Sequence, residues 1–334
     1  MKPSRQRPTS ALAQGLIFSA ILLISGCSQA ATSRDAQIDT FVNNMVAKHG
    51  FEESYVRGIV NEAEKKQSIL DAMSRPAEKV KPWYDYRDIF LTDKRIRQGV
   101  EFWGEHREQL ERISAETGVP VQMIVGIIGV ETSYGRITGN YRVVDALSTL
   151  AFDYPKRSKF FTKELGEYML LAREEDLPVL EVKGSYAGAM GPPQFMPSSY
   201  RAYAVDGDGD GRRDLLNNWA DIQMSVANYF LAHRWHPNAE VVLPATLNPG
   251  AKAPGTKNEL KTKTTLDDIR KQGISVETTL PGDSPANLVV LEGDNGIEYW
   301  VGLHNFYVIT RYNRSVMYAL AAWQLGEAIA AKVP

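Results

Sequence analysis

Glu131 is the residue whose type and position most clearly suggest chemistry. It follows the run VQMIVGIIGV (121–130), which contains no charged residue. A carboxyl group in apolar surroundings loses hydration, and this loss raises its pKa. A glutamic acid that stays protonated near neutral pH can donate a proton to a leaving oxygen, as cleavage of a glycosidic bond requires. The residue types alone leave another interpretation open, in which Glu131 caps a loop or pairs with Arg136.

A second carboxylate would be expected opposite such an acid, because most glycosidases use a pair. The nearest candidates along the chain are Asp145 and Asp153. Neither stands in a pattern that marks it as the partner of Glu131. The sequence therefore indicates either a structural glutamate or an enzyme that works with one carboxylate.

A loop rich in glycine, proline and small residues follows about fifty residues later, GSYAGAMGPPQFMPSSY (184–200). Glycine lets a backbone approach a ligand closely, and functional residues are often carried by such loops. Gln194 in this loop could orient the amide of a sugar. Pro193 has no backbone N–H, so no hydrogen bond can be donated from that position.

A second glycine-rich loop carries alternating carboxylates. Asp206, Asp208, Asp210 and Gly211 match positions 1, 3, 5 and 6 of a calcium-binding EF-hand loop. The match then weakens, because Arg213 replaces the usual apolar residue and position 12 lacks the bidentate glutamate. A plain Asp/Gly turn without metal is the alternative.

The spacing of apolar residues predicts the elements that must position these groups. Apolar residues recur at helical intervals from 38 to 46, and Gly50 suits the end of that helix. Asn295-Gly296 between two β-rich runs predicts a hairpin. The sequence therefore predicts a mainly α (α+β) protein with a small β-containing insertion. Further helices are expected at about 54–70, 93–117, 143–152, 158–174, 219–235 and 315–331, and one starts at Pro120 and carries Glu131.

Composition and charge exclude some classes of partner. The 334 residues are 43% hydrophobic and 23% charged, which is typical of a globular protein. The formal net charge is −2, so no nucleic-acid partner is expected. We expect a monomer.

The N-terminus predicts export and anchoring. A basic start (residues 2–7) precedes an apolar stretch that is short for a membrane span, as in a secretory signal. The stretch ends in ISGC (24–27), which resembles the lipobox of bacterial lipoproteins and implies lipidation of Cys27, the single cysteine. A chance cysteine beside a signal or membrane anchor is the alternative. Ser28, by resemblance to sorted lipoproteins, implies an outer-membrane location facing the periplasm.

Several motifs in order resemble one family. ETSYG (131–135) is similar to the lysozyme-like superfamily, and with GAMGPPQFMPS (188–198) it resembles lytic transglycosylases. DGDGDG, SVANYF and RYNRSVMY, beginning at residues 206, 225 and 311, narrow the resemblance. Together they resemble the membrane-bound B type of glycoside hydrolase family 103, across most of the mature chain. The expected fold is then a lysozyme-like helical catalytic core.

The resemblance implies a lytic transglycosylase that cleaves the MurNAc-(β1,4)-GlcNAc bond of peptidoglycan. Glu131 would act as acid and then as base, and the substrate's N-acetyl carbonyl and 6-hydroxyl would be the nucleophiles. A 1,6-anhydro product results, without a cofactor for catalysis. Substrate assistance of this kind is a known exception to the two-carboxylate scheme. A hydrolytic muramidase using Asp145 or Asp153, and a non-catalytic peptidoglycan-binding lipoprotein, are the alternatives.

The resemblance also assigns supporting residues. Ser185 and Gln194 would hold the acid and the N-acetyl group, and Lys156 and Arg157 could meet carboxylates of the peptide stem. A structural Ca²⁺ is expected in the acidic loop. The sugar groove would be lined by Tyr229, Tyr312, Asn313, Tyr318, Tyr86 and Arg87. The calcium ligands would be Asp206, Asp208, Asp210, the carbonyl of Arg212, and Asp221 as the closing carboxylate.

The expected organisation has six segments. They are a lipoprotein signal peptide (1–26), a lipidated tether (27–35), an N-terminal helical domain (36–118), a catalytic core with the acidic loop (119–240), a β-containing insertion (241–300), and a C-terminal part of the core (301–334).

Overall fold

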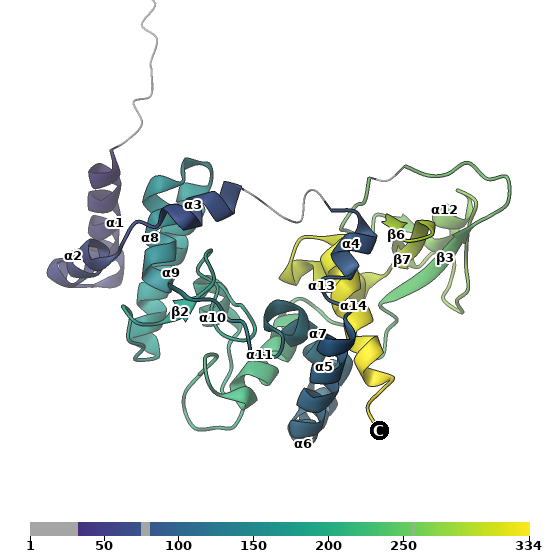
Figure 1. Ribbon diagram of the computed structural model, residues 1–334, viewed down its shortest axis with the longest axis horizontal. Helices are drawn as coiled ribbons and strands as arrows, with labels where there is room; N and C mark the ends of the chain where they lie inside the picture. Colours follow the sequence, from purple (N-terminus) through teal and green to yellow (C-terminus); the bar gives the residue numbers. More distant parts are fainter. Residues whose placement is uncertain (1–32, 75–80, 256) are drawn as a thin grey trace, which may run out of the picture. The chain divides into compact units, whose positions relative to one another are not determined.

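The computed structural model describes residues 33–74, 81–255 and 257–334. Residues Met1–Ser33 form one unit and Arg34–Pro334 another. Every described helix and strand lies in the second unit (Figure 1). The predicted signal peptide and Cys27 lie outside the described residues.

Helices dominate this unit, which confirms the predicted fold class. A short 3-10 helix, η2 (Pro155–Arg157), joins two of them. The α-helices are α1 (Arg34–His49), α2 (Glu53–Glu62), α3 (Gln67–Ser74), α4 (Trp83–Arg87), α5 (Asp93–Glu105), α6 (Arg107–Thr117), α7 (Val121–Thr132), α8 (Val143–Asp153), α9 (Ser158–Glu174), α10 (Pro197–Tyr203), α11 (Trp219–Ala232), α12 (Leu266–Arg270), α13 (His304–Tyr312) and α14 (Val316–Ala330).

Two of the predicted helices are each divided in two. The helix expected at 54–70 is α2 and α3, because the backbone between them is bound by α8: the N–H of Glu64 donates to Asp145 at 2.8 Å, and that of Lys66 to Thr149 at 3.1 Å. The helix expected at 93–117 is α5 and α6. His106 separates them with φ −115° and ψ 18°, and its ring packs on Trp219 of α11 at 5.4 Å. Long-range contacts thus override local helical spacing.

The predicted hairpin is confirmed. Strands β6 (Pro285–Gly293) and β7 (Gly296–Gly302) are antiparallel, and Gly293 pairs with Gly296, whose φ is +117°. With β3 (Val242–Leu247), β4 (Thr264–Thr265) and β5 (Ile274–Val276) they form a sheet of order β4-β6-β7-β3-β5. A separate two-stranded sheet pairs β1 (Tyr141–Arg142) with β2 (Lys183–Gly184).

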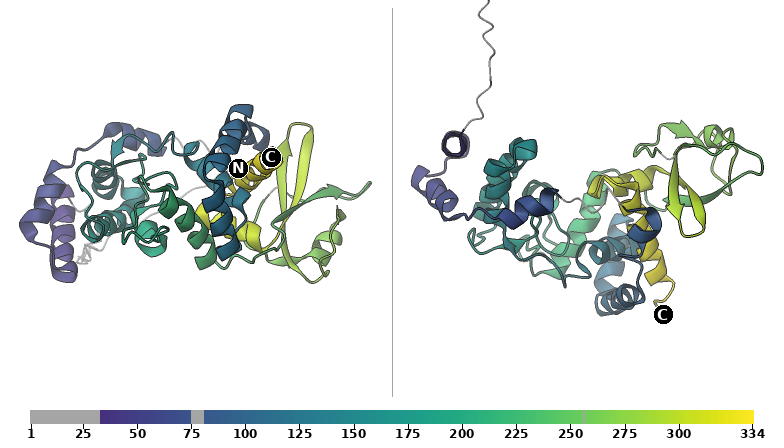
Figure 2. Two further views of the ribbon diagram at one scale, coloured as in Figure 1. Left: turned by 90° about the horizontal axis from the view of Figure 1, so that it is seen from below. Right: turned by 45° about the horizontal axis from the view of Figure 1, so that its top comes forward.

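The sheet region has its own small core. Leu266 and Ile269 of α12 pack with buried residues of the strands, such as Val301, in a cluster distinct from the main helical core. In Figure 2 the green and yellow strands lie apart from the purple helices α1 and α2. This is consistent with an insertion, although the six predicted domain boundaries remain predictions.

Helix α7 is the centre of the main core. Ile124, Val125, Ile127 and Ile128 have no exposed surface. In the described part of the chain, no single helix is long and apolar enough to cross a membrane, and only the pair α6–α7, bent by 116°, meets that criterion.

Two glycines let α7 and α14 approach closely. A Cβ on Gly126 would lie 2.4 Å from the carbonyl oxygen of Ala322, and one on Gly326 would lie 2.2 Å from that of Gln122. Real Cβ atoms do not make such contacts, so both positions require glycine for this packing. The close approach brings the beginning of α14 to the end of α7, where Glu131 lies.

Candidate active site

Glu131 lies in the last turn of α7, where the chain leaves the helix sharply. Ser133 and Tyr134 have φ of 50° and 62°, both left-handed. Arg95 of α5 donates to the carbonyl of Gly129 at 2.8 Å, placing a cation at the carboxyl end of α7. Glu131 itself is partly exposed, so a ligand can reach it.

Tyr318 holds the carboxylate of Glu131 from the opposite helix. Its hydroxyl donates to Oε1 of Glu131 at 2.5 Å, and its side chain is 2% exposed. Ser315 fixes the start of α14, since its side chain accepts a hydrogen bond from the N–H of Tyr318 at 3.2 Å. Burial first, and then the nearby negative charge of Glu131, raise the pKa of Tyr318 well above 10. The phenol therefore stays a hydrogen-bond donor at any physiological pH.

The glycine-rich loop is attached on both sides of Glu131. The hydroxyl of Thr132 donates to the carbonyl of Pro192 at 2.9 Å, and the hydroxyl of Tyr312 donates to that of Pro193 at 2.7 Å. Thr132 directly follows the glutamate, and Tyr312 ends α13. Pro193 cannot donate, but its carbonyl is an acceptor, so proline suits this position.

Gln194 shapes the loop. It has φ of +51°, and its Nε2 donates to the carbonyls of Gly191 at 3.0 Å and Thr138 at 3.1 Å. Ser185 lies at the other end, where its Oγ accepts the N–H of Ala189 at 3.0 Å. The hydroxyl proton of Ser185 can still donate to a ligand, since Oγ is the acceptor in that bond.

Two of the tyrosines predicted to line the sugar groove, Tyr229 and Tyr312, lie beside each other. The ring of Tyr229 lies 4.8 Å from that of Tyr312 and 5.6 Å from that of Phe195, and its hydroxyl donates to the carbonyl of Arg311 at 2.6 Å. Burial raises the pKa of Tyr229 and of Tyr312, the latter also through Glu131. Asn313 lies in extended backbone between α13 and α14.

The two residues from α4 have different surroundings. Tyr86 is 2% exposed, and its helix α4 packs against α14, which carries Tyr318. Arg87 instead forms ion pairs with the β6–β7 hairpin, through Asp294 and through Glu298 at 3.6 Å. The structure therefore places Arg87 as a link between α4 and the sheet.

Lys156 and Arg157 are exposed on η2. The guanidinium of Arg157 lies over the ring of Phe160, 4.3 Å from its centroid. Arg157 therefore contacts α9, the helix that follows η2. A role in binding the peptide stem remains a prediction.

Asp145 and Asp153 are occupied by structural ion pairs. Arg142 binds both oxygens of Asp145 at 2.8 Å, and that side chain is only 2% exposed. Asp153 pairs with Arg34 at 3.2 Å and with Lys65 at 2.8 Å. Both carboxylates therefore hold the first helices against α8, which gives each of them a structural explanation.

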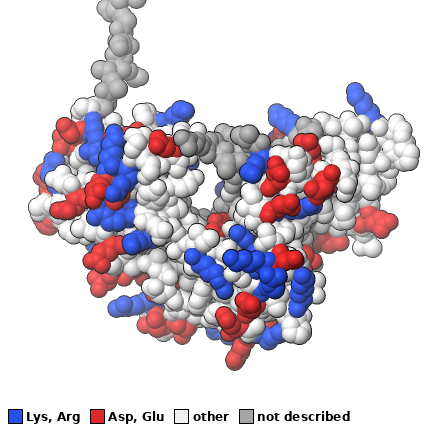
Figure 3. All heavy atoms as spheres, viewed as in Figure 1, with Lys and Arg blue, Asp and Glu red and all other residues white. Residues whose placement is uncertain are grey.

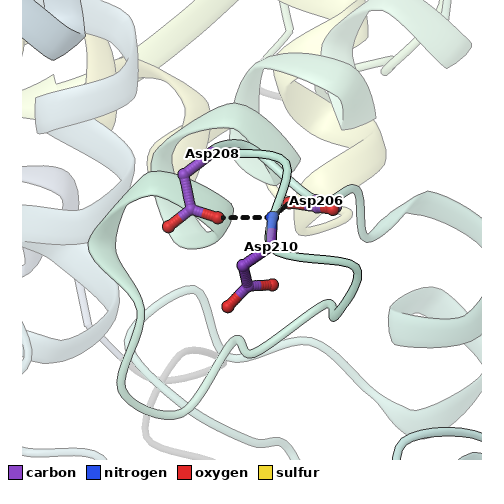
Figure 4. Close-up of side chains that lie close together, drawn as sticks. All are labelled: Asp206, Asp208 and Asp210. Atoms are coloured by element: carbon purple, nitrogen blue, oxygen red, sulfur yellow. Dashed lines mark hydrogen bonds between the residues drawn. The ribbon is translucent and has the colours of Figure 1, made fainter.

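The acidic loop brings its three carboxylates together. Oxygen atoms of Asp206, Asp208 and Asp210 lie within 4.8 Å of one another (Figure 4). Asp206 accepts the N–H groups of Gly209 at 2.6 Å and Gly211 at 2.8 Å, which curls the loop around it. The hydrogen bond from Gly211 is the main cause that lowers the pKa of Asp206.

Asp221 lies in the first turn of α11 and binds the backbone of the acidic loop, but among the described residues it is not one of the three carboxylates that converge. It is fully buried and accepts the N–H groups of Gly207 at 2.7 Å and Asp214 at 2.6 Å. Burial raises its pKa, and Asp208 and Asp206 add to this. The N–H of Arg212 donates to Asp210 at 2.8 Å. Several carboxylate oxygens that lie close together and carry negative charge suit a hard cation such as Ca²⁺.

Sequence reasoning missed the residues that support Glu131. Thr132 lies within the quoted ETSYG motif, so its hydroxyl was a visible signal. Arg95 and the glycine pair Gly126 and Gly326 carried no signal, because their roles depend on which helices meet.

Figure 3 shows the surface hollowed between the side carrying α8 to α10 and the side carrying α13 and α14.

A partly exposed glutamate at the end of a buried helix, opposite a glycine-rich loop, agrees with the lysozyme-like fold expected from the sequence. The family model described as "Transglycosylase SLT domain" matches residues 33–327. Membrane-bound lytic murein transglycosylase B of Escherichia coli K12 is 43% identical over 301 residues, 87% of this chain and 81% of that protein. The chain belongs to this family and is a peptidoglycan lytic transglycosylase.

Solved structures agree with this assignment. Lytic transglycosylase SltB1 of Pseudomonas aeruginosa, in a catenated form, has a TM-score of 0.85 and 50% identity, covering 89% of this chain and 98% of that one. Escherichia coli Slt35 in complex with calcium has a TM-score of 0.80 and 42% identity, covering 89% and 93%. Pseudomonas aeruginosa SltB3 in complex with NAG-NAM-pentapeptide has a TM-score of 0.78 and 28% identity, covering 91% and 81%. The predicted family resemblance is confirmed.

Proposed function

We propose that Glu131 cleaves the MurNAc-(β1,4)-GlcNAc bond alone, first as acid and then as base, and leaves a 1,6-anhydro-MurNAc end. One observation carries this proposal. Glu131 is held by Tyr318 in a reachable position, whereas the two alternative carboxylates, Asp145 and Asp153, are bound in ion pairs. A substrate-assisted reaction needs only one carboxylate.

In the proposed steps every bond broken is matched by a bond formed, and water is not a reactant. Glu131 gives its proton to the glycosidic oxygen while the carbonyl oxygen of the substrate's N-acetyl group forms a bond to C1, and the C1–O4 bond breaks. The ionised Glu131 then takes the proton of the 6-hydroxyl as that oxygen displaces the N-acetyl oxygen from C1. Glu131 ends the cycle protonated, and the two products together have the mass of the substrate.

Tyr318 and the loop orient this chemistry. The phenol fixes one carboxylate oxygen, which leaves the other to meet the glycosidic oxygen. Ser185 and Gln194, at the two ends of the loop, would position the N-acetyl group, and Tyr229, Tyr312, Asn313 and Tyr86 would line the sugar groove. Such rings suit sugar C–H surfaces.

The acidic loop is proposed to hold a structural Ca²⁺ through Asp206, Asp208, Asp210, Asp221 and the carbonyl of Arg212. The fit rests on converging carboxylates, and a related enzyme was solved in complex with calcium. When bound, the ion would neutralise the carboxylates and cross-link the loop to α11. No catalytic step needs it.

The protein is proposed to be a lipoprotein anchored through Cys27 in the outer membrane, facing the periplasm, and to act as a monomer. A relative is named membrane-bound, and the ISGC motif supports the anchor. Metabolic labelling with a fatty acid, compared between wild type and Cys27→Ser, tests this. Unchanged labelling of the variant would remove the proposed anchor.

Product mass tests the reaction. Purified glycan strands are digested and the new ends are analysed by mass spectrometry. An anhydro end is lighter by one water than a hydrolysed end, so the proposal requires the lighter product from wild type. Mainly hydrated ends would instead favour a muramidase, and would require a carboxylate that positions water.

A further inference from the structure

A pocket of about 350 Å³ lies beside the last turn of α7, apart from the groups assigned to the reaction. Its walls come from the beginning of α5 and from the turn that follows Glu131. This volume is within the range of pockets that bind small ligands, roughly 300–1,000 Å³. Its lining includes Lys94, Arg95, Arg136 and Ile137.

The pocket is cationic. Lys94, Arg95 and Arg136 line it, and none of its lining residues is acidic. Within residues 33–74, 81–255 and 257–334, none of these three cations forms an ion pair. Asp93 is next to Lys94 in the chain but does not line the pocket.

Arg95 is the fixed cation of the group. Burial lowers its pKa, its guanidinium lies 5.3 Å from the ring centroid of Phe90, and it donates to the carbonyl of Gly129. Arg136 is exposed and donates to the carbonyl of Ser133 at 3.2 Å, and Lys94 is exposed. Two flexible cations thus surround a rigid one, which suits an anionic group more than a neutral one.

The pocket also has an apolar edge. Ile137 is 69% exposed, and the next residue, Thr138, accepts a hydrogen bond from Gln194 of the glycine-rich loop. The turn of residues 133–138 therefore has the pocket on one side and the loop of the proposed site on the other.

We propose that this pocket binds a carboxylate-bearing segment of the peptide stem carried by the glycan substrate. The inference rests on the proposed function. An acidic peptide explains both features of the pocket, because its carboxylates would meet Lys94 and Arg136 and its alkyl groups would contact Ile137. A related enzyme was solved with a fragment that carries a pentapeptide, so stem-bearing glycan is a reasonable ligand.

The experiment compares Lys94→Gln/Arg136→Gln with wild type on two substrates, glycan strands that carry stems and strands stripped of them by an amidase. On stem-bearing strands at low salt, KM should rise by up to about fivefold for each of the two charges removed, since an exposed charge pair contributes up to about 1 kcal/mol. The turnover number kcat should not change. On stripped strands neither value should change, and high salt should reduce the difference on stem-bearing strands.

A matched control removes the same charge elsewhere. Lys252→Gln/Lys271→Gln changes two cations that line a separate pocket in the sheet region, and both KM values should equal those of wild type. Lys156→Gln/Arg157→Gln tests the other basic pair. If only that pair raises KM on stem-bearing strands, the inference is overturned.

Two further results would overturn it. An equal rise in KM on both substrates would mean that the pocket contacts sugar or supports the fold, and no rise on either would mean that it binds no part of the substrate. Melting temperatures of all variants identify a folding defect. Failure of the proposed reaction would be seen in a different result. In that case, wild type would release no anhydro products from stripped strands, whatever the KM values of the variants are.

Discussion

The loop of residues 184–196 and the loop of residues 206–214 lie on either side of α10, and both are rich in glycine. Most of the first is buried, and its polar groups bind distant elements, as Tyr312 does with Pro193 and Thr132 with Pro192. The second is mainly exposed, and its carboxylates accept N–H groups from within a few residues. One loop is shaped by tertiary contacts, and the other by its own sequence.

The two loops are therefore expected to have different functions, one in turnover and the other in stability. The first loop is fixed by neutral hydrogen bonds around a reacting acid, so its changes should affect turnover. The second concentrates negative charge that a cation would relieve, so its changes should affect stability. The predictions below test that division, from the largest expected effect to the smallest.

Glu131→Gln should lower turnover about 1,000-fold or more, because the amide cannot deliver a proton and general acid–base catalysis contributes about 10²–10⁴-fold. The melting temperature should stay close to that of wild type. Product release from purified strands measures the rate, and Glu101→Gln, an exposed glutamate on α5, is the matched control. Substantial residual activity would require a different acid.

Gly191→Ala and Gly209→Ala form a matched pair, one in each loop. Both glycines have positive φ, 66° and 82°, but a Cβ on Gly191 would lie 1.9 Å from the carbonyl oxygen of Leu215, whereas one on Gly209 meets no atom within 4 Å. Gly191→Ala should lower the free energy of unfolding by about 3 kcal/mol or more, and Gly209→Ala by about 1 kcal/mol.

Chemical denaturation without calcium measures both free energies. Equal losses in the two variants would contradict the view that only the first loop is enclosed by tertiary contacts. Gly191→Ala should also lower turnover, because Gly191 accepts a hydrogen bond from Gln194.

Chelation of calcium-loaded protein should lower the melting temperature by about 5–10 °C, because a ligand at a hundredfold excess over Kd stabilises a protein by about 2.7 kcal/mol. Well below the melting temperature, kcat should be unchanged. Asp208→Asn should reduce the shift, whereas the exposed Asp283, in the sheet region, provides the control Asp283→Asn. A calcium-independent melting curve would remove the proposed ion.

Tyr312→Phe and Tyr200→Phe each remove one buried hydroxyl. Tyr312 donates to Pro193 in the first loop, and Tyr200 donates to the carbonyl of Arg213 at 2.5 Å beside the second. Tyr312→Phe should cost about 1–2 kcal/mol of the free energy of unfolding, because a buried acceptor loses its donor. Tyr200→Phe should cost more, because the N–H of Leu215, which donates to the Tyr200 hydroxyl at 2.7 Å, also loses its partner. Only Tyr312→Phe should lower kcat, and steady-state kinetics on glycan strands compares them.

His233 gives the smallest predicted effect, on stability against pH. Burial lowers its pKa below 6.5, and its ring stacks on Tyr229 at 4.2 Å. Below pH 6.5 the unfolded chain binds this proton more readily than the folded one, so the free energy of unfolding should fall as the pH drops below 6.5. Urea denaturation at pH 7 and pH 5 should show a smaller loss for His233→Gln than for wild type.

Local patterns allowed much of the fold and part of the site to be predicted. The β6–β7 hairpin followed from Asn295-Gly296, since turn chemistry is local. The cluster of Asp206, Asp208 and Asp210 followed from alternating acids and glycines for the same reason. The breaks at Ala63–Lys66 and at His106 were not predictable, because groups on α8 and α11 cause them.

By itself the sequence determined that Glu131 closes an apolar helix, that a glycine-rich loop carries Gln194, and that an acidic loop could hold a cation. These properties depend on neighbours within a few residues. Only the tertiary structure decided that Tyr318 holds Glu131 and that Asp145 and Asp153 serve ion pairs instead. The first outcome depends on how closely α7 and α14 approach, which Gly126 and Gly326 permit because neither has a side chain, although they lie about two hundred residues apart in the chain. The second depends on how α8 packs against the first helices, which places Arg34 and Lys65 beside Asp153.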